Sequence, residues 1–385
     1  MSIPRTGPLA HIRILEVAHM LAGPYCGMLL ADLGAEVIKI ETGHGDIARG
    51  VGGGSVGGHN AYFASLNRNK KSITLDLAVP SEKAVFHHLV SSAQGLVTNL
   101  RPRAIRKLGL TYEDLKSFNP RLACLALTGF GLKGPHSDLP AYDYVIQAMT
   151  GLMMLTGEPD APPSRAGYSV VDNTGGMMAA IGLLAKLLEG RGGQIDVALY
   201  DTMLSQLNYL ASAYLNGAEE PVRYPRGGHS FFVPAQIFDT ADGYVALFIT
   251  HDRFWNVFAT ALGREEWLTD ERFATVEARN KHRELVVGAV ASVLKTGRTQ
   301  HWVDLLQSKG VVIAGVATLK QALESENTAS RDMICDIPTL DGPLRLIANP
   351  IKIEGVDQRQ YHAPPRLGEH TDCYRDRSCP AQDSG

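Results

Sequence analysis

Short apolar runs and helix-length segments alternate through the first half of this chain, and this order constrains the fold more than any other feature of the sequence. Apolar strands separated by helices form βαβ units, whose strands are parallel and buried on both faces. We therefore predict an α/β fold with a mostly parallel sheet. The predicted strands are 12–17, 36–40, 72–77, 95–100, 122–127 and 194–199, and the predicted helices are 23–33, 81–93, 142–154 and 174–188.

Loops at the carboxyl ends of the strands are the expected place for a binding site. An open α/β sheet binds its ligands outside those ends. In this sequence the rule directs attention to the loops 19–24, 99–103 and 169–173.

The length of the chain and one polar stretch predict two domains. A chain of 385 residues exceeds the size at which a single core usually stops growing. The stretch 217–225 is polar and rich in turn residues, as an interdomain connection is. We predict a large domain at 1–220, completed by 320–385, and a small domain at 225–318. Within and after the small domain we expect a hairpin at 235–238 and 244–249, helices at 252–262, 270–294 and 300–308, and a return to the large domain through 311–316 and 345–352.

Composition argues against several classes of protein. Lysine and arginine total 37 against 40 aspartate and glutamate, a net charge of -3, so no general nucleic-acid surface is expected. The five cysteines have neither CxxC nor paired-histidine spacing, so we expect no disulfide framework, no zinc site and a reducing, cytoplasmic location. No secretion signal precedes the fold, and the most apolar run, 177–188, is broken by Lys186 and is too short to span a bilayer. We therefore expect a soluble protein without a bound metal.

Two glycine patterns resemble dinucleotide-binding loops but lack their context. Gly52, Gly54 and Gly57 form a GxGxxG that does not directly follow a strand, and no helical pattern follows the looser match at Gly43 and Gly45. We expect no nicotinamide site here, and we interpret 50–58 as a mobile loop that can approach a ligand.

Basic residues gather in two places, the stretch 67–71 and the group Arg101, Arg103, Arg106 and Lys107. A solvated charged face is the commoner explanation of such clusters. The alternative is a phosphate-binding site, because cations on loops at strand ends supply charge and donors to phosphate oxygens.

Asp172 lies in the stretch GYSVVDNTGG at 167–176, ahead of a segment with an apolar helical face. Capping of that helix is the commoner role for Asp, Asn or Thr at such a place. A catalytic role is compatible with capping, because the positive end of the helix dipole keeps a carboxylate ionised, as a nucleophile must be. The glycines Gly175 and Gly176 would leave backbone N–H groups open to a developing oxyanion.

His19 and Cys26 are weaker candidates. His19 precedes a Gly-Pro pair that begins a helix, and a lone histidine is more often structural than catalytic. Cys26 falls within an apolar helical run without a helper residue nearby. No GxSxG motif supports a serine hydrolase.

Taken together, a series of short segments resembles the family III coenzyme A transferases, which include formyl-CoA:oxalate and carnitine-type transferases and have the α-methylacyl-CoA racemases as relatives. The order and spacing of the segments carry the resemblance over nearly the whole chain. The segments are HMLAGP at 19–24, LGAEVIKIE at 33–41, NRNKK at 67–71 followed by 72–77, Asn99 with Arg101-Pro102, AYD at 141–143, 192–198 and LGEHT at 367–371. The resemblance implies an intertwined, ring-like homodimer, in which each subunit has a Rossmann-like large domain and a smaller α+β domain, with active sites between subunits.

The resemblance also implies a covalent mechanism on Asp172. The carboxylate attacks the donor thioester to give a mixed anhydride, coenzyme A then forms an aspartyl-CoA thioester, and the incoming acid reverses these steps. No tightly bound cofactor is implied, since coenzyme A and acyl-CoA are substrates.

Coenzyme A contacts carry over from the family to a set of loop residues. The set is His19, Met20, Ala22, Leu75, Asn99, Leu100, Arg101, Lys107, Leu108 and the site tyrosine Tyr142. This chain departs from the formyl-CoA enzyme at Leu21, Thr42 and Ala78, where that enzyme has glutamine, arginine and lysine. These departures argue against formyl-CoA:oxalate specificity and put the adenine and phosphate contacts in question.

Two alternatives to transfer stay open at this point. A racemase needs an acid and a base on opposite faces of the α-carbon, and the histidine of the GHDINY-like racemase stretch is replaced here by Tyr142. A non-catalytic acyl-CoA-binding protein would keep the fold without a covalent adduct. We favour transfer, with acyl-CoA and a small carboxylic acid as the partners. Arg165, Arg226 and His229 are candidates to hold a second carboxylate, which suggests succinyl-CoA as donor and an itaconate-, mesaconate- or citramalate-like acceptor.

Overall fold

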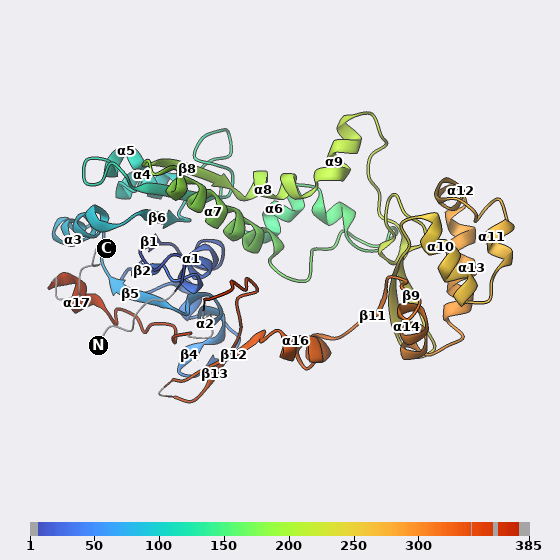
Figure 1. Ribbon diagram of the computed structural model, residues 1–385. Coiled ribbons are helices and arrows are strands. Elements are labelled where there is room, and N and C mark those ends of the chain that lie inside the picture. Colours follow the sequence, from blue (N-terminus) through green and yellow to red (C-terminus); the bar gives the residue numbers. More distant parts are fainter. Residues whose placement is uncertain (1–6, 340, 357–360, 377–385) are drawn as a thin grey trace. The chain divides into compact units, whose positions relative to one another are not determined.

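The computed structural model describes residues 7–339, 341–356 and 361–376 of the chain (Figure 1). The chain divides into two compact units. The first unit comprises Met1–Thr150, Gly167–Asn208 and Glu326–Gly385, and the second comprises Gly151–Ala166 and Tyr209–Ser325. The division differs from the predicted domains, because 151–166, 209–220 and 320–325 belong to the second unit.

A six-stranded sheet in the order β5-β2-β1-β6-β7-β8 forms the centre of the first unit. Every neighbouring pair is parallel, and Leu15 of β1 pairs with Ile38 of β2 on one side and Leu96 of β6 on the other. The predicted parallel sheet is therefore confirmed, although the strand expected at 72–77 lies earlier. The strands are β1 Arg13–Val17, β2 Glu36–Glu41, β5 Lys70–Thr74, β6 Gly95–Thr98, β7 Ala123–Thr128 and β8 Gly193–Ala198.

Helices cover both faces of the sheet. On one face, Phe86 and Leu89 of α3 and Ile105 of α4 join a core with alternate strand residues such as Leu15 and Ile38. On the other face lie α1 and α7, where the Leu183 side chain packs over Gly95 of β6. The helices of the first unit are α1 Ala22–Asp32, α2 Ala61–Asn67, α3 Pro80–Ser92, α4 Pro102–Leu108, α5 Tyr112–Leu115, α6 Asp143–Met149, α7 Val170–Glu189, α8 Leu199–Gln206, α16 Glu326–Ser330 and α17 Thr371–Arg375, with the 3-10 turn η1 Ile47–Arg49.

Charged side chains are buried beneath α1. Glu16 of β1 forms ion pairs of 2.9 Å with Lys39 and 2.8 Å with Lys70, and all three side chains are fully buried. Gly27 of α1 leaves room for this group, because a Cβ there would lie 1.9 Å from a Glu16 oxygen. The sheet is thus apolar on its α3 face and partly ionic beneath α1.

The first turn of α1 lies close to α7 at Gly176, in the second turn of α7. A Cβ at Gly176 would lie 2.8 Å from the carbonyl oxygen of Ala22 and 3.3 Å from the amide nitrogen of Cys26. Gly176 therefore permits backbone contact between the two helices.

The second unit contains a small antiparallel sheet and a layer of helices. Val245 of β10 pairs with Phe238 of β9 and with Gly315 of β11. The predicted hairpin is confirmed, whereas 311–316 does not return the chain to the large domain, because β11 extends the small sheet. The elements are η2 Leu152–Leu155, α9 Asn208–Leu215, η3 Pro225–Gly227, β9 Ala235–Asp239, β10 Tyr244–Phe248, α10 Asp252–Ala261, α11 Glu266–Thr269, α12 Val276–Lys281, α13 Arg283–Leu294, α14 Thr299–Gln307, β11 Ile313–Gly315 and α15 Leu319–Leu323, of which α9 begins in the first unit.

The C-terminal part returns to the first unit and covers the β5 edge of the large sheet. The His370 amide donates to the Ser72 carbonyl, and the Thr371 hydroxyl accepts from the Thr74 amide. The LGEHT motif therefore protects an exposed strand edge. Two hairpins complete the unit, β3 Ser55–Val56 with β4 His59–Asn60, and β12 Ile334–Ile337 with β13 Leu344–Ile347.

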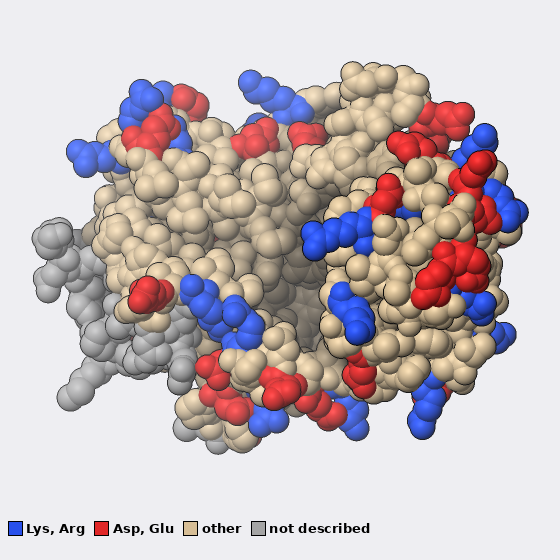
Figure 2. Space-filling view, turned by 45° about the vertical axis from the view of Figure 1, so that its right-hand side comes forward, with Lys and Arg blue, Asp and Glu red and all other residues tan. Residues whose placement is uncertain are grey.

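Acidic and basic side chains are interspersed on the face drawn in Figure 2. None of the helices that the structure describes is long and apolar enough to cross a bilayer, and its residues hold no cluster of three metal-ligating side chains. Cys373 is disulfide-bonded, a bond that the cysteine spacing did not indicate, while Cys26, Cys124 and Cys335 are free.

Candidate active site

The order of the strands reverses between β1 and β6, and the carboxyl ends of two such strands are where an open α/β sheet binds its ligands. Asn99, after β6, ties the two strand ends together. Its side-chain oxygen accepts from the His19 amide at 3.0 Å, and its side-chain nitrogen donates to the His19 carbonyl at 2.8 Å. The loops at 19–24 and 99–103 thus lie at the expected place and are joined to each other by these two hydrogen bonds.

Buried charges fix the backbone of the 18–20 loop. Met20 has a φ of 63°, and its amide donates to Asp46 at 2.9 Å. Lys39 forms an ion pair of 2.8 Å with the other Asp46 oxygen and donates to the Ala18 carbonyl at 2.8 Å. The 18–20 loop carries two of the predicted contacts, His19 and Met20, and is therefore held by side chains from β2 and the segment that follows it.

His19 is neutral near pH 7 in this structure. Burial lowers its pKa, and the nearby charge of Asp46 opposes that effect without cancelling it. A neutral imidazole can accept or donate a hydrogen bond but cannot supply a positive charge. His19 therefore suits a polar contact to a ligand better than a contact to a phosphate.

Asp172 lies in the first turn of α7, and the helix begins at Val170, earlier than predicted. The N-cap is Ser169, whose side chain makes no capping hydrogen bond. The interpretation of Asp172 as the N-cap is therefore wrong, and its carboxylate is not needed to start the helix.

The carboxyl group of Asp172 is unusually basic. Burial, which is the larger cause, and the negative charge of Asp143 together raise the pKa of Asp172 to about 7. The first turn of a helix favours a negative charge, but the two opposing effects are larger here. The prediction that the helix dipole keeps Asp172 fully ionised is wrong, because about half of these groups carry a proton at a pH equal to the pKa.

Asp143 takes the capping role that Asp172 does not fill. It begins α6, is buried, and accepts a 2.9 Å hydrogen bond from the Val171 amide in the first turn of α7. Its other oxygen accepts from the Gln147 amide group at 2.6 Å. Asp143 thus fixes the turn that carries Asp172 and places a second negative charge beside it.

Tyr62 of α2 is the third polar group near this turn. Burial, which is the larger cause, and the negative charge of Asp172 raise the pKa of Tyr62 to about 12. Its hydroxyl therefore stays protonated and can donate a hydrogen bond close to the Asp172 carboxylate.

Gly175 and Gly176 do not form an oxyanion hole. Both lie inside α7 and are buried, Gly175 against the Leu199 side chain and Gly176 against the α1 backbone. Their role is close packing, so the prediction of open N–H groups at these glycines is wrong.

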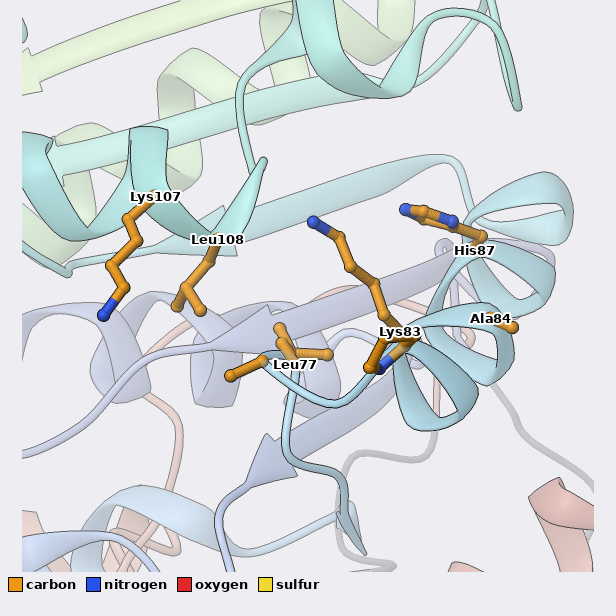
Figure 3. A pocket seen from close by; sticks show the side chains of 8 residues that line it. Leu77, Lys83, Ala84, His87, Lys107 and Leu108 are labelled. Carbon is orange, nitrogen blue, oxygen red and sulfur yellow. The ribbon is translucent and has the colours of Figure 1, made fainter.

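A cavity of about 460 Å³ lies between the start of α3 and the end of α4 (Figure 3). Two predicted coenzyme A contacts, Lys107 and Leu108, line it. The other lining residues are Leu77, Ala78, Pro80, Lys83, Ala84 and His87. Of these, Leu77, Ala78 and Pro80 follow β5, at the carboxyl edge of the sheet.

The remaining predicted contacts differ in their exposure. Leu75 is buried in the core on the α3 side of the sheet, with Leu100 packed partly against that core. Arg101 and Tyr142 are exposed, and Tyr142 is the N-cap of α6 directly before Asp143. Leu75 can therefore reach a ligand only through its backbone or by rearrangement, whereas the other three are accessible.

The basic stretch 67–71 is neither a solvated face nor a phosphate site. Arg68 is buried and pairs with Asp32 at 2.6 Å, Lys70 is buried with Glu16, and Lys71 pairs with Glu36 at 2.7 Å. These cations are neutralised inside the fold. On α4, by contrast, Arg101, Arg103, Arg106 and Lys107 are exposed.

The glycine-rich stretches have structural roles. Gly57 and Gly58 have positive φ and face Thr339 and Asp341 so closely that a Cβ would clash. The predicted ligand-binding loop is therefore packed against the C-terminal segment. The looser match at 43–48 forms the turn that presents Asp46 to the 18–20 loop.

Arg165, Arg226 and His229 all lie in the second unit. Arg226 forms an exposed ion pair of 2.8 Å with Asp239, and Arg165 is half-buried. Burial, followed by the charge of Arg283, lowers the pKa of His229, whose ring lies among aromatic side chains. A neutral His229 is a weaker partner for a carboxylate than the sequence suggested.

Sequence reasoning gave no role to Asp143, Tyr62 or Lys83. Asp143 stood in the AYD segment, but its contact with Val171 joins residues 28 positions apart. The place of Lys83 near the start of a helix could have been predicted, because Pro80 is a typical first residue of a helix and follows a strand closely. Cys26 is buried, and burial raises the pKa of its thiol, so it is not a nucleophile.

The family model described as CoA-transferase family III matches residues 9–371 of this chain. An acetyl-CoA:oxalate CoA-transferase from Acetobacter aceti is 33% identical over 370 residues, which cover 94% of this chain and 94% of that protein. A succinyl-CoA–D-citramalate CoA-transferase from Chloroflexus aurantiacus is 33% identical over 378 residues, which cover 94% of this chain and 92% of that protein. The crystal structure of a CaiB/BaiF family protein from Brucella suis matches with a TM-score of 0.84 and 32% sequence identity, over 97% of this chain and all of that one.

Proposed function

The chain belongs to CoA-transferase family III, and we propose that it moves coenzyme A from an acyl-CoA to a small carboxylic acid through covalent intermediates on Asp172. The observation that carries this proposal is the place of Asp172, in the first turn of α7. That turn comes just before Gly176, where α7 contacts the first turn of α1. Helix α1 follows β1, one of the two strands between which the strand order reverses. A carboxylate at this place can meet a thioester bound at the carboxyl ends of these strands.

In the proposed first half-reaction, an oxygen of ionised Asp172 attacks the donor thioester carbonyl. The carbon–sulfur bond breaks, coenzyme A leaves as a thiolate, and a mixed anhydride remains. The thiolate then attacks the aspartyl carbonyl of the anhydride. The donor acid leaves as a carboxylate, and Asp172 carries coenzyme A as a thioester.

The second half-reaction reverses these bonds with a new acid. The acceptor carboxylate attacks the aspartyl thioester, releasing the thiolate and forming a second anhydride. The thiolate takes the acyl group of the acceptor, and the Asp172 carboxylate is restored. No net proton is consumed.

The electrostatics of Asp172 suit this chemistry. A carboxylate whose pKa is about 7 is more basic, and therefore more nucleophilic once ionised, than one with an ordinary pKa. Burial of the group also limits the access of water to an anhydride, which would otherwise be hydrolysed. Asp143 contributes to both properties because it anchors the turn and adds a charge.

We propose small dicarboxylic acids as the acceptor class, with succinyl-CoA as a candidate donor. The names of two relatives, an acetyl-CoA:oxalate and a succinyl-CoA–D-citramalate transferase, support this class. Arg165 and Arg226 are the candidates for the second carboxylate, and the ion pair of Arg226 with Asp239 has to open before Arg226 can contribute. A panel of succinyl-, acetyl- and formyl-CoA against mono- and dicarboxylates tests the class, and exclusive use of monocarboxylates would exclude it.

We also propose that a second copy of the chain covers α7. Met177, Met178 and Ile181 are exposed apolar side chains within a little more than one turn of this helix. Apolar groups gathered in this way mark an interaction surface. Light scattering of the purified protein should give the mass of a dimer.

The experiment that tests the mechanism is replacement of Asp172 by Asn. Asp172→Asn removes the nucleophile with little change in volume and should lower turnover at least about a thousandfold, with coenzyme A binding retained. Incubation of the parent protein with acyl-CoA and hydroxylamine should leave a hydroxamate on Asp172 that mass spectrometry detects. Unchanged turnover in Asp172→Asn would refute the proposed mechanism.

A further inference from the structure

Asp143 is a buried carboxylate that has no basic partner among the residues that the structure describes. Each of its oxygens instead accepts one hydrogen bond from a neutral group. One oxygen accepts from the Val171 amide at 2.9 Å, and the other accepts from the side-chain amide of Gln147 at 2.6 Å. Two N–H donors, one from α7 and one from α6, therefore hold this carboxylate in place.

Gln147 is fully buried, which is unusual for a glutamine. It lies one turn after Asp143 in α6, at the spacing of four residues at which two helical side chains meet. Burial of a side-chain amide is unfavourable unless the group is hydrogen-bonded. The contact with Asp143 satisfies one N–H of this amide and links Gln147 to the turn that carries Asp172.

The proposed intermediates place a group that water can attack beside Asp143. While Asp172 carries coenzyme A as a thioester, it has no charge, and Asp143 is the carboxylate whose charge reaches this position. A carboxylate beside an activated carbonyl can take a proton from water, and such general-base catalysis accelerates a reaction by about a hundredfold or more. Hydrolysis at this stage would release coenzyme A without activating the acceptor acid. A transferase therefore gains if its neighbouring carboxylate is prevented from acting as a base.

We propose that Gln147 keeps the reaction on the path of transfer, because it holds the Asp143 carboxylate and so prevents it from activating a water molecule. This inference rests on the proposed function, since it takes the aspartyl thioester as the intermediate. The Gln147 side chain both binds the second oxygen of Asp143 and fills the space beside it. Gln147 acts through Asp143 and is a positioning residue.

Loss of the Gln147 amide would permit one hydrolytic step. The freed Asp143 oxygen takes a proton from water, and the water oxygen attacks the aspartyl carbonyl carbon of Asp172. The carbon–sulfur bond breaks, and coenzyme A leaves as a thiolate that takes the proton from Asp143. Asp172 is left as a carboxylic acid, which ionises again, and one water molecule is consumed for each thioester.

Replacement of Gln147 by Ala tests this inference through the ratio of hydrolysis to transfer. With succinyl-CoA and no acceptor acid, Gln147→Ala should release coenzyme A at least about tenfold faster than the parent protein, once spontaneous hydrolysis is subtracted. Transfer at saturating acceptor should stay close to the parent rate, since the Val171 amide still holds Asp143. Liquid chromatography of coenzyme A measures both rates. A merely structural role of Gln147 would lower both rates together.

The double variant Gln147→Ala with Asp143→Asn separates the base from the space that Ala leaves. An amide cannot take a proton from water, so hydrolysis should return to the parent rate. Water that carries heavy oxygen identifies the carbon that is attacked. In a single turnover of Gln147→Ala, mass spectrometry should find the label on Asp172 and not in the released succinate.

Two controls make the result specific. Gln300 donates to Asp304 at 2.7 Å with the same spacing, in α14 of the second unit, and Gln300→Ala should leave hydrolysis unchanged. Thermal unfolding shows whether Gln147→Ala is folded. If it is not, Gln147→Ser replaces it, because its short side chain also cannot reach Asp143 and should give the same result.

Three outcomes would overturn the inference. They are an unchanged rate of hydrolysis in folded Gln147→Ala, fast hydrolysis that persists in the double variant, and a label found only in the released succinate. Each of them leaves transfer by the parent protein intact. Turnover that survives in Asp172→Asn would instead refute the proposed function, so the two failures are distinguishable.

Discussion

Replacement of Asp143 by Asn should move the pH dependence of the enzyme toward acid. The proposed mechanism requires ionised Asp172, so kcat/KM of the parent protein for the acyl-CoA should follow a pKa of about 7. With that pKa, about 9% of Asp172 is ionised at pH 6 and about 90% at pH 8. The parent rate should therefore rise about tenfold between these pH values.

The size of the change in Asp143→Asn follows from the two causes of the raised pKa. Burial is the larger cause and the charge of Asp143 the smaller. Removal of the smaller cause should lower the pKa of Asp172 from about 7 but not below about 5.5, which lies near the midpoint between the ordinary and the observed values. At pH 6 the ionised fraction, and with it kcat/KM, should rise by up to about eightfold. At pH 8 the rate should be equal or slightly lower, because a less basic carboxylate is a weaker nucleophile.

The assay measures kcat/KM for the acyl-CoA from pH 5.5 to 9 at a fixed acceptor concentration. The Asn oxygen can still accept from the Val171 amide, and the Gln147 amide can turn to meet the new NH2 group, so the turn should hold. Asp196→Asn is the matched control, since Asp196 also accepts a backbone hydrogen bond, from Leu132, but belongs to β8. An acid limb that stays at pH 7 in Asp143→Asn, or moves to higher pH, would refute the reasoning.

Two further predictions concern stability. Burial opposes ionisation of Glu36, but ion pairs with Lys71 and Arg13 outweigh it and lower the pKa of Glu36 from 4.5 to about 2. The lowered pKa stabilises the folded state above pH 4.5, and this stabilisation is lost as the pH falls toward 2. In urea unfolding, Glu36→Gln should therefore lower the free energy of unfolding by about 3 kcal/mol at pH 7 and by much less at pH 3. An equal loss at both pH values would contradict this. On α7, Gly176→Ala should destabilise by about 1–3 kcal/mol because its Cβ meets the α1 backbone. Its control Gly182→Ala, whose Cβ makes ordinary contacts, should stabilise by up to about 1 kcal/mol, and equal effects of the two substitutions would count against this account of the helix crossing.

The strands of the large sheet could be predicted where apolar residues follow one another, as throughout most of β7 and in the centres of β1 (Ile14-Leu15) and β2 (Val37-Ile38), although β1 and β2 also carry charges. The strand β5 was misplaced because it begins with Lys70 and Lys71, which are unfavourable in a buried strand unless they are paired. Their partners, Glu16 and Glu36, come from other strands. Sequence patterns show a charge but not the opposite charge that neutralises it.

The candidate site was predictable in position but not in its electrostatics. Strand order and the loops after β1 and β6 place His19 and Asn99 together, as the rule for open sheets requires. The ionisation of Asp172 could not be predicted, because it depends on burial and on Asp143, and both follow from the packing of α6 against α7. The helix start was also missed, since valines at 170 and 171 give no cap signal and the cap comes from another helix.

The buried ions beneath α1 have their main effect on the geometry of the site rather than on stability. A buried ion pair often contributes little net stability, because the cost of desolvating both charges offsets their attraction, but removal of one partner is strongly unfavourable. Here the same charges make directional contacts, with Lys39 donating to the Ala18 carbonyl and Asp46 accepting from the Met20 amide. Apolar residues of equal volume would preserve the packing but would give up both contacts. The 18–20 loop, with Met20 in its left-handed conformation, would then no longer be fixed at the end of β1, where the proposed mechanism brings the donor thioester to Asp172.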